Sequence, residues 1–203
     1  MAATRSRRSV ELTDPVALRA VAHPLRLALI GLLRTEGPLT ATQAGRRLGE
    51  SAPKCWFHLR QLAKYGLVEE AGGGHGRERP WRATAETTTL PRVASTPELA
   101  VAAERFTTFL AERYFEALTG WLAGKASEPA EWQEAMIFGD TVLSLTADEL
   151  AELKGELRAL LERYLDRAAD RSQRPPGARQ VTFLHFAFPG SLLDTATQPT
   201  GRG

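Results

Sequence analysis

Two short stretches with helical spacing, joined by one glycine, constrain the fold of this 203-residue chain more than any other feature. Thr40 begins the first stretch and Gln43 follows three residues later, which is the arrangement of a capping box at the start of a helix. Gly49 lies between the stretches, and the second stretch, residues 51–65, stops at Gly66. Two helices joined by a short turn that contains glycine form a helix-turn-helix pattern.

The segments on either side of this pair complete a small domain. Residues 14–34 are predicted to form two helices, broken at Pro24 because proline disfavours helical backbone in the residue before it. Directly after the pair, residues 67–70 and 81–84 are predicted strands, and the glycine-rich loop between them makes a β-hairpin. The sequence therefore predicts a winged helix-turn-helix domain at residues 10–86.

The rest of the chain is predicted to form a second domain at residues 97–190. Helices are expected at 97–122 and 147–170, each with an apolar stripe. Strands are expected at 134–145 and 180–188, and the second is apolar on both faces, so we expect it in a sheet that is covered on both sides. The predicted fold class is α+β, with an N-terminal winged helix-turn-helix followed by a C-terminal helical domain with a small sheet.

Charge divides the chain in the same way. Residues 1–84 hold 14 Lys/Arg and 7 Asp/Glu, a net charge of +7, whereas residues 85–203 hold 12 and 17, a net charge of −5. Without Arg5, Arg7 and Arg8 the first part still carries +4. Such asymmetry indicates a basic half that faces a polyanion, although chance together with a basic disordered arm would also explain it.

Composition narrows the setting in which the protein works. We expect no contact with a membrane, because no run of about 18 uncharged apolar residues occurs. Glu11 and Asp14 follow the basic start, so no secretory signal is expected. A single cysteine, Cys55, cannot form an internal disulfide, which fits the reducing cytoplasm. A cytoplasmic location is therefore expected.

Two strings within the predicted winged helix resemble a known family. Residues 22–27 (Ala-His-Pro-Leu-Arg-Leu) resemble a helix opening of the ArsR (arsenic-repressor-like) winged-helix regulators, and so do residues 57–68 (Phe-His-Leu-Arg-Gln-Leu-Ala-Lys-Tyr-Gly-Leu-Val). The resemblance covers residues 14–84 and implies a homodimeric repressor or activator that binds DNA. Residues 97–203 do not resemble the short dimerisation helix of that family. They look like an appended domain, in which we expect dimerisation and the binding of an unknown small-molecule effector.

The expected partner of the second helix of the pair is double-stranded DNA. A helical wheel places Cys55, Leu59, Leu62 and Ala63 inward, and the outward face of such a helix enters the major groove. The predicted contacts, from this helix and from the hairpin, are Ser51, Lys54, Trp56, Phe57, His58, Arg60, Gln61, Lys64, His75, Arg77 and Arg79. Two alternatives stay open: Phe57 packs against the hairpin or the second domain, and the hairpin tip is merely solvated.

No metal, cofactor or catalytic site is expected. In metal sensors that resemble this chain a cysteine pair lies near the positions of residues 40–42, which are Thr-Ala-Thr here, and residues 97–122 offer no histidine as the alternative ligand. Cys55 and His58 are too few ligands for zinc, and His185 fits a core histidine better than a metal ligand. Neither a phosphate-binding glycine motif nor a Gly-x-Ser-x-Gly elbow occurs.

The sequence thus predicts a sequence-specific transcription regulator that acts as a homodimer, because one winged helix reads few base pairs and two-fold dimers are the commonest assembly. Two other functions stay open. A winged helix can serve as a module that contacts protein or RNA, since a fold does not dictate its function. An effector-binding enzyme with a vestigial DNA-binding head is the second.

Overall fold

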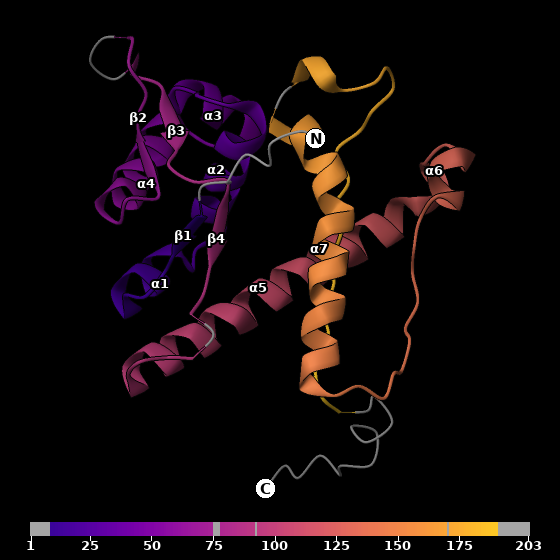
Figure 1. Ribbon diagram of the computed structural model, residues 1–203. Coiled ribbons are helices and arrows are strands. Elements are labelled where there is room, and N and C mark those ends of the chain that lie inside the picture. Colours follow the sequence, from indigo (N-terminus) through magenta and orange to yellow (C-terminus); the bar gives the residue numbers. More distant parts are fainter. Residues whose placement is uncertain (1–8, 75–77, 92, 170, 191–203) are drawn as a thin grey trace, which may run out of the picture.

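The computed structural model of the chain describes residues 9–74, 78–91, 93–169 and 171–190. The first elements are β1 (Ser9–Glu11), α1 (Pro15–Val21), α2 (Pro24–Glu36), α3 (Ala41–Leu48), α4 (Ala52–Lys64), β2 (Val68–Glu70), β3 (Trp81–Ala83) and β4 (Thr87–Thr89). They are followed by α5 (Pro97–Gly124), η2 (Lys125–Ser127), α6 (Ala130–Glu134), α7 (Ala147–Ala169) and η3 (Arg171–Gln173). Figure 1 shows α1–α4 and the strands gathered in one group, from which α5 extends.

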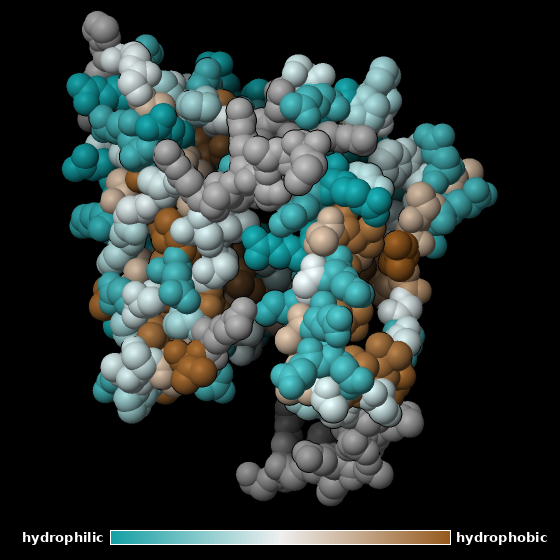
Figure 2. All heavy atoms as spheres, in the orientation of Figure 1, coloured by the Kyte–Doolittle hydropathy of each residue, from teal (hydrophilic) through white to brown (hydrophobic). Residues whose placement is uncertain are grey.

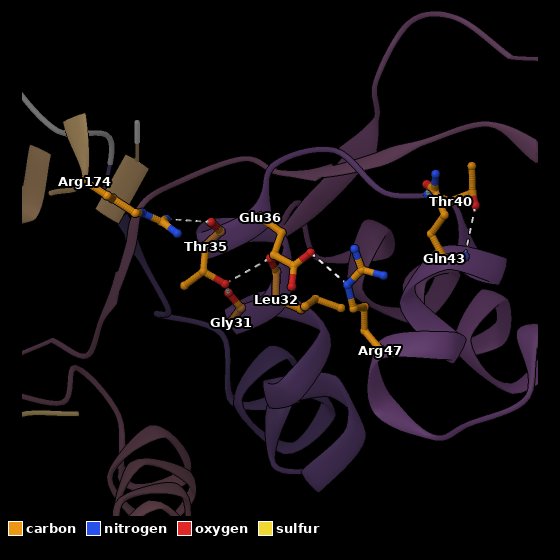
Figure 3. Close-up of polar contacts among 8 residues, drawn as sticks. All are labelled: Gly31, Leu32, Thr35, Glu36, Thr40, Gln43, Arg47 and Arg174. Carbon is orange, nitrogen blue, oxygen red and sulfur yellow. Dashed lines mark hydrogen bonds and ion pairs between the residues drawn. The ribbon is translucent and has the colours of Figure 1, made fainter. Parts of the chain in front are cut away.

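Side-chain caps explain where the helices begin. The Asp14 carboxylate accepts a hydrogen bond from the Val16 backbone N–H at 2.9 Å, and this bond caps α1. At the start of α3, the Thr40 hydroxyl accepts from the Gln43 N–H at 3.2 Å, and the Gln43 side-chain oxygen accepts from the Thr40 N–H at 2.8 Å. The Thr40–Gln43 pair is drawn in Figure 3, and the predicted capping box is confirmed.

In the described ranges there are two sheets, each of two strands, and both lie within residues 9–89. β2 and β3 pair antiparallel, with Val68 opposite Ala83, so the predicted hairpin is confirmed. β1 pairs in parallel with β4, a pairing that the sequence did not predict. Such three-residue strands carry no periodicity that a sequence reveals, and pairing between residues so distant along the chain depends on the packed domain.

The hydrophobic core draws on α1–α4, the hairpin and the first turns of α5. Leu18, Leu29 and Leu59 are fully buried at its centre. Leu99, Ala102 and Phe106 of α5 belong to the same core. Leu99 is only 1% exposed. The start of α5 was expected to open a second domain, yet its apolar stripe completes the first.

The two strands expected in the C-terminal region do not form. Residues 135–146 and 174–188 adopt no helix or strand, and α6 lies directly before the first of these segments. An extended segment becomes a strand only when a neighbour accepts and donates its backbone hydrogen bonds, and the described part of the chain supplies none. The α+β class itself is confirmed, because helices and small sheets are both present.

Polar contacts tie the end of α2 to its neighbours, as Figure 3 shows. Arg47 of α3 lies 3.1 Å from the Glu36 carboxylate, which holds the first helix of the helix-turn-helix against α2. Arg174, near the end of the described chain, donates to the Thr35 carbonyl at 3.3 Å. The last turn of α2 therefore touches both α3 and the C-terminal region.

No single helix among the described residues is long and apolar enough to cross a membrane. Helices α1 and α2 reach the required length and composition only when taken together, and the chain bends by 86° between them.

Candidate nucleic-acid interface

The turn between α3 and α4 sets the position of the candidate recognition helix. Gly49 adopts a φ of 68°, a left-handed conformation that favours glycine. A Cβ on Gly45 would lie 2.5 Å from the Glu50 carbonyl oxygen, so only glycine lets the turn fold back onto α3. Gly45 is a residue that the sequence analysis missed. Glycine in the interior of a helix lowers the stability of that helix. A glycine in a helix as well capped as this one therefore indicates a position where a side chain would not fit.

Helix α4 buries one face in the core and presents the other to solvent. The Ser51 hydroxyl accepts from the Lys54 N–H at 3.4 Å and caps the helix, so Ser51 supports the interface through the backbone. Cys55, Leu59 and Leu62 are each 0% exposed, as the helical wheel predicted. The opposite face of α4 is therefore free for a partner.

The outward face of α4 carries cations and aromatic rings. Phe57 is 52% exposed and Trp56 is 40% exposed, so neither packs into the core. The Arg60 guanidinium lies 5.7 Å from the centre of the Trp56 ring, within the range of a cation–π contact. The remaining predicted contacts of this helix, Lys54, Gln61 and Lys64, are exposed or half-buried.

His58 does not lie on this face, which corrects its prediction as a DNA contact. The side chain is 6% exposed, and its Nδ1 accepts a hydrogen bond from the Arg26 Nε at 3.2 Å. Its ring is 4.4 Å from that of His23. The helical wheel did not predict this burial. The start of α2 covers a wider part of α4 than the row of inward residues on the wheel indicates.

Carboxylates already pair with two of the cations that were predicted to contact DNA. Lys54 Nζ lies 2.8 Å from the Glu50 carboxylate. On the hairpin, Arg79 lies 2.8 Å from Glu70. Arg82, which the sequence analysis did not select, lies 2.7 Å from Glu69 in the same way. Exposed ion pairs contribute about 0–1 kcal/mol each, so a phosphate group can displace these partners.

Arg46, Arg60 and Lys64 differ from those cations. All three are exposed, and within the described ranges of the chain they have no carboxylate within ion-pairing distance. Two of them lie on α4 and one on α3. His75 and Arg77 of the hairpin tip lie outside the described residues. The uncompensated positive charge of the described interface is therefore concentrated on the helix-turn-helix itself.

In the part of the chain that the structure describes, no three His, Cys, Asp or Glu side chains are grouped as a metal site. Burial raises the pKa of the Cys55 thiol, with a smaller contribution from the negative charge of Glu50. Its sulfur is therefore held as an uncharged thiol in the core.

Comparison with known proteins identifies part of this region. A model of a helix-turn-helix domain family matches residues 21–71, which span α2, α3, α4 and β2. No curated protein matches the chain. Residues 21–71 thus form a helix-turn-helix domain, a type of domain that supports DNA binding and the regulation of transcription.

Proposed function

We propose that the protein is a sequence-specific transcription regulator that binds double-stranded DNA as a homodimer, in the manner of the ArsR-like regulators that its N-terminal strings resemble. One observation carries the proposal. Helix α4 follows the helix-turn-helix turn, buries Cys55, Leu59 and Leu62, and exposes its cations and aromatic rings on the opposite face.

The chemistry of that face suits the major groove. Arg60 and Lys64 supply positive charge to phosphates or to guanine, and Gln61 can bond adenine. Phe57 exposes a ring that would contact a thymine methyl group. The β2–β3 hairpin follows α4 directly, and its Arg79 would exchange Glu70 for a phosphate.

Salt dependence tests the DNA-binding part. The full chain should bind a random-sequence duplex, and log K should fall with log salt at about −0.9 per phosphate contacted. Lys64→Gln should reduce that slope by about one contact. Arg158→Gln, which removes the same charge from an exposed site on α7, is the matched control and should leave the slope unchanged. An affinity that is flat between low and moderate salt would contradict the proposal.

The homodimer is inferred from apolar surface that the described chain leaves uncovered. Figure 2 shows brown, apolar side chains at the surface over α7 and the chain segment beside it. The exposed large apolar residues beyond α5's midpoint are Tyr114, Phe115, Leu122, Ile137, Phe138, Val142, Leu143, Leu145, Leu153, Leu160, Tyr164, Val181, Phe183, Phe186 and Phe188. Patches of this kind mark protein–protein interfaces. A second copy would cover these side chains and would supply the second DNA-binding helix-turn-helix.

Sedimentation tests the dimer. The full chain should sediment as a dimer at micromolar concentration. A chain shortened to end at Leu110 keeps Leu99, Ala102 and Phe106 in the core, so it should fold and sediment as a monomer. A full chain that is monomeric, or a shortened chain that is still dimeric, would rule out this interface.

The rest of the proposal concerns setting and chemistry. We infer a cytoplasmic regulator without a catalytic role and without a resident metal, in which the C-terminal region joins the protomers and receives any small-molecule effector. Purified protein that holds a stoichiometric metal, or DNA binding that a chelator abolishes, would contradict the metal-free part of the proposal.

A second function is favoured by one observation, the exposure of Trp56 next to Phe57. Large aromatic side chains are enriched in protein–protein interfaces, so α4 would then contact a protein. The salt titration separates the two functions, because a protein-contact face need not bind duplex DNA at all.

A further inference from the structure

Two histidines face each other between the helix-turn-helix and the helix before it. His23 precedes α2 and caps it, while His58 lies in the middle of α4. Their ring centres are 4.4 Å apart, and the planes are tilted by 40°. The DNA-binding face proposed above uses neither ring.

Both rings act as hydrogen-bond acceptors through the same nitrogen. His23 Nδ1 accepts from the Leu25 backbone N–H at 3.1 Å, which is the side-chain cap of α2. His58 Nδ1 accepts from Arg26 Nε at 3.2 Å, and Arg26 also donates to the Ala20 carbonyl. An imidazolium ring carries a proton on each nitrogen and cannot accept. Protonation of either ring would therefore break a bond that joins α2 to its cap or to α4.

The surroundings add to this preference for neutral rings. Arg26 and Lys54 place positive charge near both histidines, and Glu50 is the carboxylate that opposes them. Arg113 of α5 lines the same open cavity as His23, Glu50 and Lys54. Burial is the largest cause that lowers the pKa of both histidines, and the charges of Arg26 and Lys54 lower it further.

We propose that His23 and His58 are positioning residues that hold helix α4 against α2 only while both imidazole rings are neutral, so that acidification weakens DNA binding by the full chain. This inference rests on the proposed function for its consequence, but the histidine link itself is a property of the fold. It would make the regulator responsive to internal acidity.

The direction of the pH effect follows from linkage. Because folding lowers both pKa values below that of a free histidine, the stabilisation is complete above the pKa of the unfolded chain, near 6.5. It is lost as the pH falls through the lower values of the folded state. Each of the two protons can change the unfolding constant by at most about tenfold per pH unit.

Asparagine substitutions separate the proton from the hydrogen bond. In His23→Asn and His58→Asn the side-chain oxygen can accept where Nδ1 accepts now, and it does not titrate; asparagine is also a strong helix cap. The matched control is His185→Asn, which makes the same chemical change at an exposed residue of the C-terminal region. The measurements are the urea midpoint and the affinity for a random-sequence DNA duplex, both at constant ionic strength from neutral to acidic pH.

The wild-type chain and His185→Asn should lose stability and DNA affinity on acidification, and the double variant His23→Asn/His58→Asn should lose markedly less of both. Added positive charge alone would raise the affinity of the wild type for DNA at low pH, so the sign distinguishes the link from simple attraction. Equal pH profiles in the wild type and the double variant would overturn the inference.

Nuclear magnetic resonance of the histidine rings in the wild-type chain gives a second test. This test does not depend on whether the variants fold. His23 and His58 should titrate at lower pH than a free histidine, and titration of both at the ordinary value would overturn the inference. If the wild type binds no duplex at any pH, the proposed function fails, while the urea and ring titrations still judge the histidine link.

Discussion

The chain before Phe106 and the chain after it are built differently, although both are rich in helix. Among the residues whose exposure the structure describes, every buried side chain lies at or before Phe106, and most of them belong to one core. Beyond Phe106, no residue with described exposure is buried, even on the long helices α5 and α7. Helical periodicity alone therefore does not make a domain, since an apolar stripe needs another surface to cover it.

A matched pair of leucine substitutions gives the largest test of this comparison. Leu99→Ala removes a side chain that is 1% exposed and should lower the free energy of unfolding by about 2–5 kcal/mol. Leu160→Ala removes one that is 46% exposed and should cost under about 0.5 kcal/mol in a monomer. Urea unfolding measures both. A large cost for Leu160→Ala that grows with protein concentration would show that a second copy covers α7.

The turn that positions α4 should tolerate change no better than the core. Gly45→Ala would push a Cβ to 2.5 Å from the Glu50 carbonyl, so the α3–α4 turn must shift. We expect a loss of about 1–3 kcal/mol in the free energy of unfolding, together with weaker DNA binding. Thermal unfolding and a duplex-binding assay would check this. A variant as stable as the wild type would mean that the turn is loosely packed.

The sequence revealed those features that local chemistry determines. The Thr40–Gln43 capping box, the stop at Gly66 and the β2–β3 hairpin each depend on residues close together in the chain. The features that were missed depend on distant partners. The burial of His58 requires the start of α2, and the pairing of β1 with β4 requires the packed domain.

The two C-terminal strands were wrongly predicted for a related reason. Residues 180–188 have the composition of a covered strand, and that composition does not say which segment will pair with them. In the structure Phe186 stacks on Phe115 at 6.2 Å, yet the backbone beside it is in no sheet. The candidate site was easier to predict than this region, because six of its outward residues lie on one helix: Lys54, Trp56, Phe57, Arg60, Gln61 and Lys64.

Two exposed phenylalanines, one on α4 and one on α5, extend the comparison of the two parts of the chain to DNA binding. Phe57→Ala and Lys54→Ala should each weaken binding to a selected DNA site by about 1–3 kcal/mol, with little change in the unfolding midpoint, because both side chains point outward. Phe115→Ala, which removes an equally exposed ring from the far half of α5, is the control. Fluorescence anisotropy at several protein concentrations measures both effects.

The two phenylalanine variants should differ in how they depend on protein concentration. Phe57→Ala should weaken binding by the same factor at every concentration, because a base contact is lost. Phe115→Ala should weaken it only where dimers dissociate. Unfolding of the domain by Phe57→Ala would instead place that ring in the core and contradict the outward face of α4.

The smallest predicted effect distinguishes the two parts most directly. Gly31 in α2 and Gly155 in α7 are both exposed helical glycines, and a Cβ on either would meet nothing within 4 Å. Alanine is favoured over glycine inside a helix by about 0.5–1 kcal/mol, partly because it restricts the unfolded chain. Gly31→Ala should therefore raise the free energy of unfolding by that amount, since α2 belongs to the cooperative core.

Gly155→Ala should add as much only if α7 unfolds in the same step, which requires a second copy to cover its leucine face. Urea titration at low and high protein concentration measures the difference, and a gain from Gly155→Ala in a monomeric chain would show that α7 needs no partner.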